Sequence, residues 1–148
     1  MQSVTEPPSS SSSWQEQRRA AAEGLADAAA RKRAAEAEQA AALLREFAAQ
    51  ARSRGLRTAQ LAARGHDGRS TYRTGVEGWY LRRNHTLGVG LDGAFYVLTV
   101  PGGLRARFRG VELAASDPPL VVGAGGRDGE SIALPELIAL RLAAGDDW

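Results

Sequence analysis

Residues 14–54 are nearly all strong helix formers, and this run limits what the chain can fold into more than any other feature. Ser13 precedes the run and Glu16 follows three residues later, which is the spacing of a capping box. Gly55 stands just past the run, at the position where glycine ends many helices. We therefore expect one long helix over this range.

The large apolar residues of this helix are concentrated near its end. After Trp14, Leu25 is the only one before position 43. The last turns then carry an apolar stripe formed by Leu43, Leu44, Phe47 and Ala51. We expect the last three turns to pack on the rest of the domain and the earlier turns to project from it. The alternative is a solvated helix without a partner, because propensity alone can favour such a helix.

The segment before the helix, residues 1–13, is rich in serine and proline and has almost nothing to bury. It cannot offset the entropy cost of ordering, so we expect a disordered tail. It also lacks the apolar segment of a secretory signal, and no apolar run in the chain reaches the roughly 18 residues that a membrane span needs. With no cysteine for disulfides, the expectation is a cytoplasmic protein that does not contact membranes.

The charge of the chain is nearly balanced. Its 19 basic and 17 acidic residues give a net charge of +2, which is too small to steer an acidic partner over a long range. Lys32 is the only lysine, and the bias toward arginine and alanine is typical of a GC-rich bacterial genome. The number of arginines therefore says little about function, whereas their placement says more.

Beyond the helix the sequence pattern changes from helical to alternating. Residues 56–63 are predicted as one more short helix and residues 65–70 as a loop, after which the chain is predicted to form a sheet. The expected organisation is a tail over residues 1–13, a helical region over residues 14–64 and a sheet domain over residues 65–148.

Asp92-Gly93 is a strong signal for a two-residue hairpin loop, because a type I′ turn needs positive φ at both positions. This turn pairs Val89 with Tyr96, and a further hairpin closes through residues 101–103. One face of the sheet then carries the predicted core residues Leu87, Val89, Leu91, Tyr96, Leu98, Val100, Leu104 and Phe108.

The strand over residues 78–82 joins this sheet through a loop at residues 83–85. A loop with an odd number of residues places Trp79 and Leu81 on the core face, whereas an even one would bury Arg82 instead. Burial favours the odd loop, because a one-residue slip in register reverses every side chain.

The opposite face of the predicted sheet gathers arginines and aromatic rings. Its members are Tyr80, Arg82, Phe95, Arg105, Arg107 and Arg109. Guanidinium groups beside exposed rings suit phosphate contact and base stacking, so this face is the candidate site for single-stranded nucleic acid or a nucleotide. In the alternative, the N-terminal helix covers Phe95 and Val97, and the arginines lie on an edge strand, where they discourage aggregation.

The C-terminal part is predicted to form a short strand at residues 120–122, a glycine-rich loop at residues 123–129, a last strand near residues 130–134 and a closing helix. Pro135 suits the first turn of that helix, and Gly145 suits its end. The predicted fold class is therefore α+β, with a long N-terminal helix, an antiparallel sheet of about four to six strands, and a short C-terminal helix packed on the sheet.

Residues that could carry chemistry are few. His66 and His85 are the only histidines, and neither has further ligands at metal spacing. His85 is better explained as a turn residue, because histidine tolerates unusual φ values. The glycine-rich loop lacks the Gly-Lys-Ser/Thr ending of a phosphate-binding loop, and no serine lies in a nucleophile elbow. We therefore predict no catalytic residue, no metal site and no cofactor.

These patterns support three functions of different class. The leading prediction is a non-catalytic protein-interaction module, in which the N-terminal helix binds a partner protein or forms a coiled coil with a second copy. The second is a nucleic-acid or nucleotide binder that uses the arginine and aromatic face. An enzyme of unknown class comes third, because the chain lacks a credible acid–base or metal set.

Overall fold

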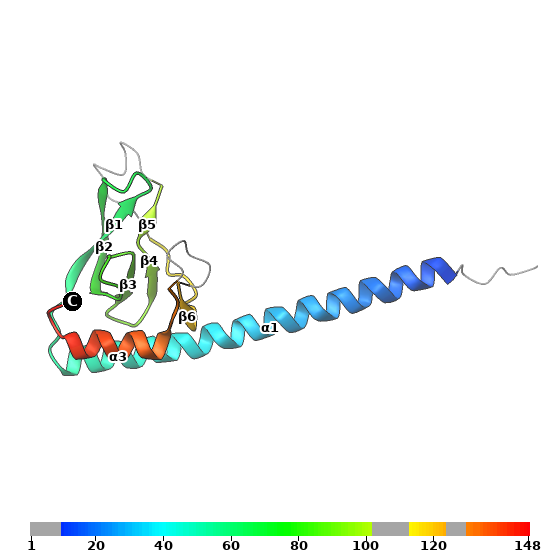
Figure 1. The fold of residues 1–148 in the computed structure, drawn as a ribbon, viewed down its shortest axis with the longest axis horizontal. Coiled ribbons are helices and arrows are strands. Elements are labelled where there is room, and N and C mark those ends of the chain that lie inside the picture. Colours follow the sequence, from blue (N-terminus) through cyan, green and yellow to red (C-terminus); the bar gives the residue numbers. More distant parts are fainter. Residues whose placement is uncertain (1–9, 102–112, 124–129) are drawn as a thin grey trace, which may run out of the picture. The chain divides into compact units, whose positions relative to one another are not determined.

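The computed structural model describes residues 10–101, 113–123 and 130–148, and its elements form an α+β arrangement (Figure 1). A long N-terminal helix precedes a mostly antiparallel five-stranded sheet, a two-stranded sheet and a short C-terminal helix, so the predicted fold class is confirmed. The elements are α1 (Ser10–Ser53), β1 (Ala59–Gly65), β2 (Thr71–Tyr80), β3 (Leu87–Gly90), β4 (Phe95–Val97), β5 (Thr99–Val100), β6 (Val121–Val122), β7 (Ile132–Ala133) and α3 (Leu134–Ala144).

The chain divides into two compact units, Met1–Ala35 and Glu36–Trp148, and α1 contributes to both. In the first unit, every residue from Ser13 onward is exposed. The second unit holds both sheets, α3 and the main hydrophobic core. The part of α1 that packs in this core therefore lies within the second unit.

The start of α1 differs from the prediction. The helix begins at Ser10, so Ser13 lies inside it and is not its N-cap. Once a helix is formed, each added residue gains one hydrogen bond, and this favours extension through the serines that precede the predicted start. Residues 1–9 of the predicted tail lie outside the described residues.

The end of α1 agrees with the prediction. The amide of Gly55 donates to the carbonyl of Arg52 at 3.1 Å, and the amide of Leu56 donates to the carbonyl of Ala51 at 2.9 Å. These are the two hydrogen bonds of a Schellman motif, which satisfies carbonyls that the last turn leaves unpaired. The glycine at this point therefore ends the helix and turns the chain toward the sheet.

The five-stranded sheet has the order β4-β3-β2-β1-β5, and its two outer strands are consecutive parts of one chain segment. Only Leu98 separates them. The amide of Leu98 donates to the carbonyl of Thr86, next to β3, at 2.8 Å, and its carbonyl accepts from the amide of Arg64, in β1, at 2.6 Å. The sheet therefore curls back on itself, and β5 lies parallel to β1, a pairing that the sequence did not predict.

The predicted helix over residues 56–63 is wrong, because the chain forms strand β1 there. Burial alternates along β1, with Leu61, Ala63 and Gly65 on the buried side. The prediction relied on the helix propensity of alanine and leucine, and antiparallel pairing with β2 overrides that propensity.

The register that the odd loop predicts is confirmed, although β2 ends at Tyr80 and β3 begins only at Leu87. Trp79 pairs with Val89, and both belong to the same buried cluster as Leu81. Arg82 is half-buried and stays out of this cluster. His85 has a positive φ of 60°, in agreement with its predicted place in a turn.

The hairpin between β3 and β4 differs from the prediction by one residue. The amide of Gly90 donates to the carbonyl of Ala94 at 2.9 Å, so three residues, 91–93, form the loop instead of two. The loop ends at Gly93, whose φ of 89° is one that glycine adopts without strain. As a result, Val89 pairs with Phe95 and not with Tyr96. A one-residue slip reverses the strand faces, so Phe95 lies in the core.

Five of the eight predicted core positions that the structure describes are buried in spite of this slip. The buried ones are Trp79, Leu81, Val89, Leu98 and Val100. The half-buried ones are Leu87 and Tyr96, while Leu91 is exposed. The predicted positions Leu104 and Phe108, with most of the predicted turn at residues 101–103, lie outside the described residues.

The main core is built from α1, α3 and one side of the curled sheet (Figure 1). Phe47 of α1 meets Trp79 edge to face, with ring centroids 5.8 Å apart. Other members of this cluster are Leu44, Ala48, Ala51, Val89, Phe95, Leu134 and Leu137. On the other side of the sheet, Leu61 and Leu98 pack so closely on Gly88 that a Cβ there would lie 2.7 Å from a methyl of the first and 3.1 Å from one of the second.

The C-terminal elements agree with the prediction. β6 and β7 pair in antiparallel fashion, and the amide of Leu134 donates to the carbonyl of Leu120 at 2.8 Å. Pro135 lies in the first turn of α3, and Gly145 follows its last residue. Residues 124–129 of the predicted glycine-rich loop lie outside the described residues.

Candidate functional site

The structure describes three of the six residues of the predicted arginine and aromatic face. Those outside the described residues are Arg105, Arg107 and Arg109. Phe95 is only 4% exposed, because it packs in the core, and its ring is therefore not available for stacking on a base. Tyr80 and Arg82 lie at the end of β2 and just after it, and both are half-buried. The structure thus brings two of these residues together and separates Phe95 from them.

Tyr80 makes contacts within the domain. Its hydroxyl oxygen accepts a hydrogen bond from the amide of Ala62 at 3.0 Å. Its ring stacks on His85, with the centroids 3.8 Å apart and the planes 10° from parallel. These contacts connect β2 to β1 and hold the β2–β3 loop against the strand that precedes it.

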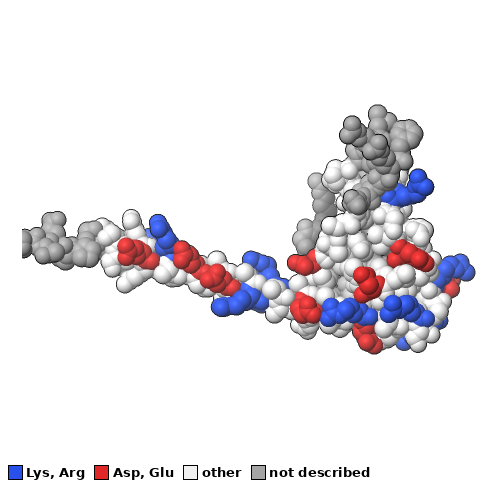
Figure 2. Space-filling view, turned by 180° about the vertical axis from the view of Figure 1, so that it is seen from behind, with Lys and Arg blue, Asp and Glu red and all other residues white. Residues whose placement is uncertain are grey.

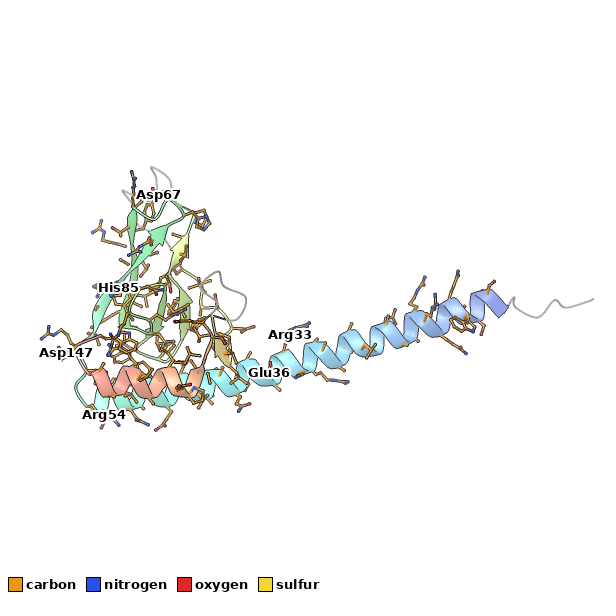
Figure 3. The ribbon with its side chains drawn as sticks, viewed as in Figure 1. Arg33, Glu36, Arg54, Asp67, His85 and Asp147 are labelled. Atoms are coloured by element: carbon orange, nitrogen blue, oxygen red, sulfur yellow. The ribbon has the colours of Figure 1, made fainter. Side chains whose placement is uncertain are left out.

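A cavity of about 720 Å³ lies beside this loop. The loop itself contributes Arg82, Arg83 and Asn84. The polar residues from β7 and its flank and from α3 are Glu130, Ser131 and Glu136. The apolar residues of the lining are Ile132, Leu137, Leu140 and Trp148. Figure 3 shows Asp147 next to α3, Asp67 at the opposite end of the sheet and His85 between the two.

The charged groups of this cavity have no charged partners in the described part of the chain. Arg82, Glu130 and Glu136 form no ion pair or side-chain hydrogen bond with any residue that the structure describes. The guanidinium group of Arg83 lies 4.9 Å from the ring centroid of Trp148, a cation–π contact that holds it at the cavity. The cavity therefore presents two cations and two anions whose charges are not neutralised by the side chains that the structure describes.

Arg141 of α3 is only 5% exposed and lies near Trp148, a residue of the cavity lining. Its Nε donates to the carbonyl of Tyr80 at 2.8 Å, and its Nη1 donates to the carbonyl of Gly145 at 2.6 Å. Burial lowers the pKa of the Arg141 guanidinium below its usual value, and the nearby Asp146 carboxylate opposes this shift. The guanidinium also lies 5.6 Å from the ring centroid of Trp148. Arg141 thus ties α3 to the end of β2 and to the C-terminal residues that line the cavity.

We expect Arg141→Met to lower the free energy of unfolding by about 1–3 kcal/mol, because it removes a buried guanidinium that donates to the carbonyls of Tyr80 and Gly145. Urea denaturation followed by circular dichroism measures this change. Arg73→Met is the matched control, because Arg73 is exposed and its replacement should change stability by less than about 0.5 kcal/mol. Equal stability of the two variants would show that the hydrogen bonds of Arg141 do not support the fold.

The sequence did contain a signal for Arg141 that our reasoning missed. The buried residues of α3 are Leu134, Leu137 and Arg141, at the spacing of one helix face. An arginine at the next position of an apolar stripe indicates a buried guanidinium. Its acceptors are backbone carbonyls of other segments, however, and no side-chain pattern encodes them.

The turn between β1 and β2 holds the other candidate residues. His66 is exposed, and Asp67 Oδ1 accepts hydrogen bonds from the amides of Arg69 and Ser70, both at 2.9 Å. These bonds give the carboxylate a role in the local turn. No group of three potential metal ligands occurs among the residues that the structure describes.

Charges of both signs share the surface in Figure 2, with acidic and basic side chains close to one another on the sheet domain and along α1. This face, as far as it is described, has no broad region of one sign, in keeping with the net charge of +2. A further finding is that no helix in the described ranges is long and apolar enough to cross a membrane.

Comparisons with known proteins were carried out with family models, with curated proteins and with solved structures. None of the three gave a significant match.

Proposed function

We propose that the protein is a non-catalytic protein-interaction module and that residues 13–35 of α1 are its docking element. The observation that carries this proposal is the exposure of large apolar side chains on a helix segment with no buried residue. Trp14 is 60% exposed and Leu25 is 74% exposed. Water-exposed groups of this size gain about 1.5–3 kcal/mol each when a partner buries them fully.

These two side chains lie on one face of the helix. Trp14 and Leu25 are 11 residues apart, which at about 100° per residue leaves them roughly 20° apart around the helix axis. Ala21 and Ala28 lie on the same side, and small residues there allow another backbone to come close. Tryptophan is enriched among the residues that dominate binding energy at protein interfaces. This stripe is hereafter called the Trp14 face.

The composition of the segment also supports docking. Alanine and arginine have high helix propensity, so the segment holds its helical form without packing on a core. A partner then binds a helix that is already formed, and less ordering entropy opposes association. The partner is either another protein or a second copy of this chain.

The test is a pair of substitutions in the full chain. We expect Trp14→Gln with Leu25→Gln to weaken self-association or partner binding about 30-fold or more, because hot-spot residues contribute about 2 kcal/mol or more. Light scattering reads self-association, and co-purification from the native host followed by titration of the isolated partner reads binding. The control is Ala30→Gln with Ala34→Gln, which lie on the opposite side of the helix.

Two results would contradict the proposal. In one, the Trp14 and Leu25 double variant keeps the mass and the partners of the wild type. In the other, both double variants lose association equally, which would mean that helix content and not the Trp14 face is responsible.

The nucleic-acid function stays a prediction. Its three strand arginines lie outside the described residues, and the burial of Phe95 removes one stacking ring from the face.

A further inference from the structure

We propose that the cavity beside the β2–β3 loop binds a short peptide of two or three residues with free termini and apolar side chains. This inference is independent of the docking role of α1, because every residue of the cavity lies in the second unit. A volume of about 720 Å³ falls in the range of roughly 300–1,000 Å³ that is typical of small-ligand sites.

The loop side of the cavity suits a carboxylate. Arg82 and Arg83 are adjacent, and the amide of Asn84 follows them on the same loop. A planar guanidinium donates two parallel hydrogen bonds to a carboxylate, and such charge-assisted bonds are the stronger kind. The cation–π contact with Trp148 restricts the position of the Arg83 guanidinium before any ligand binds, which lowers the entropy cost of binding.

A second feature distinguishes a peptide from a phosphate. Glu130 and Glu136 line the same cavity, and their carboxylates have no ion-pair partner in the described part of the chain. Two carboxylates repel a dianion, and they also attract an ammonium group. A ligand that satisfies both charge pairs carries one carboxylate and one ammonium, as a peptide with free termini does.

The remaining lining suits apolar side chains. Leu137 is buried beneath the cavity, while Leu140 is 50% exposed and would be covered by a ligand. Trp148 adds an aromatic ring, and its indole N–H is buried without an acceptor among the described residues. A peptide supplies carbonyl oxygens as well as apolar side chains, so its chemistry matches each part of this lining.

The experiment titrates the full chain with the dipeptide Leu-Leu by isothermal calorimetry, together with three other probes. These are N-acetyl-Leu-Leu, Leu-Leu-amide and inorganic phosphate. We expect saturable binding of Leu-Leu. Each capped peptide should bind about tenfold more weakly, because each cap removes one charge-assisted contact. Phosphate should show no saturable binding, because the two carboxylates of the cavity repel a dianion. In NMR spectra, the amides of Asn84, Ser131 and Leu140 should shift on addition of Leu-Leu.

Two variants then assign each terminus to a side of the cavity. Arg82→Gln should weaken Leu-Leu about tenfold and leave the binding of Leu-Leu-amide unchanged, because the amide has no carboxylate to lose. Glu136→Gln should weaken Leu-Leu by a similar factor and leave N-acetyl-Leu-Leu unchanged. Arg73→Gln and Glu46→Gln are exposed controls outside the cavity, and the Trp14 and Leu25 double variant should also bind Leu-Leu normally.

Several results would overturn the proposal. One is the absence of saturable binding of Leu-Leu, with or without binding of phosphate. A second is equal affinity for the free and the capped peptides. A third is equal loss of binding in Arg82→Gln and in Arg73→Gln. Amide shifts confined to α1 would overturn it as well, because they would place the ligand outside the cavity.

Discussion

Trp79→Ala should lower the free energy of unfolding by about 3–5 kcal/mol, which is a large part of the stability of a domain of this size. Trp79 is 1% exposed and is the largest fully buried side chain that the structure describes. Its removal leaves a cavity between α1 and the sheet and deprives Phe47 of its aromatic neighbour. It also removes the indole N–H that donates to the carbonyl of Leu56 at 3.3 Å. Urea denaturation monitored by far-UV circular dichroism gives the value.

Two variants make this result specific. Trp79→Phe keeps a ring in the core and should cost clearly less than Trp79→Ala. Trp14→Ala makes a similar change at an exposed site in the first unit and should alter unfolding of the core by less than about 0.5 kcal/mol. If Trp79→Ala and Trp14→Ala lowered the free energy of unfolding equally little, Trp79 would not be packed between α1 and the sheet.

Gly78→Ala should destabilise the protein by about 3 kcal/mol, at the upper end of the usual effect of overpacking. A Cβ at this position would overlap the backbone carbonyl oxygen of Val89 and would lie 2.9 Å from Cα of Gly90. Both obstacles are backbone of the neighbouring strand β3, so rotation of a side chain cannot relieve the clash. The pairing of β2 with β3 would have to open. Chemical denaturation and amide hydrogen exchange in these strands measure the loss.

Gly24→Ala is the matched control for this substitution. Gly24 lies within α1, and a Cβ there would meet nothing within 4 Å. The same chemical change should therefore raise helix content, with a gain of about 0.5–1 kcal/mol for that segment. If Gly78→Ala lowers stability and Gly24→Ala raises it, the close approach of the β3 backbone is the cause of the effect at Gly78. A neutral Gly78→Ala would contradict the β2–β3 pairing.

The N-terminal and C-terminal helices follow from the local sequence. Strong helix formers over residues 14–54 and a glycine after them are sufficient to predict α1 and its end, since propensity and capping act between near neighbours. For α3, Pro135 and Gly145 mark both ends for the same reason. The sequence also predicted that the side chains of Trp79 and Leu81 point into the core, because only a loop with an odd number of residues places both of them there.

The sequence did not predict three features of the sheet, namely strand β1, the register of the β3–β4 hairpin and the pairing of β5 with β1. β1 has a helical composition, and pairing with β2 decides its conformation. The β3–β4 turn could have two or three residues, and the choice decides whether Phe95 or Tyr96 enters the core. Leu98 closes the sheet by hydrogen bonds to Arg64 and to Thr86, which are far apart along the chain. No local sequence pattern predicts such contacts.

The cavity was the feature least predictable from the sequence, because its lining residues come from segments that meet only in the tertiary structure. Arg82 and Arg83 come from one loop, Glu136 from a helix and Trp148 from the C-terminal end, and each is unremarkable in its own segment. The hydrogen bonds of Arg141 to carbonyls of β2 and of the chain after α3 help to bring these segments together. Local sequence therefore determined the helices, whose interactions are short in range, whereas packing between distant segments determined the sheet register and the charges that meet in the cavity.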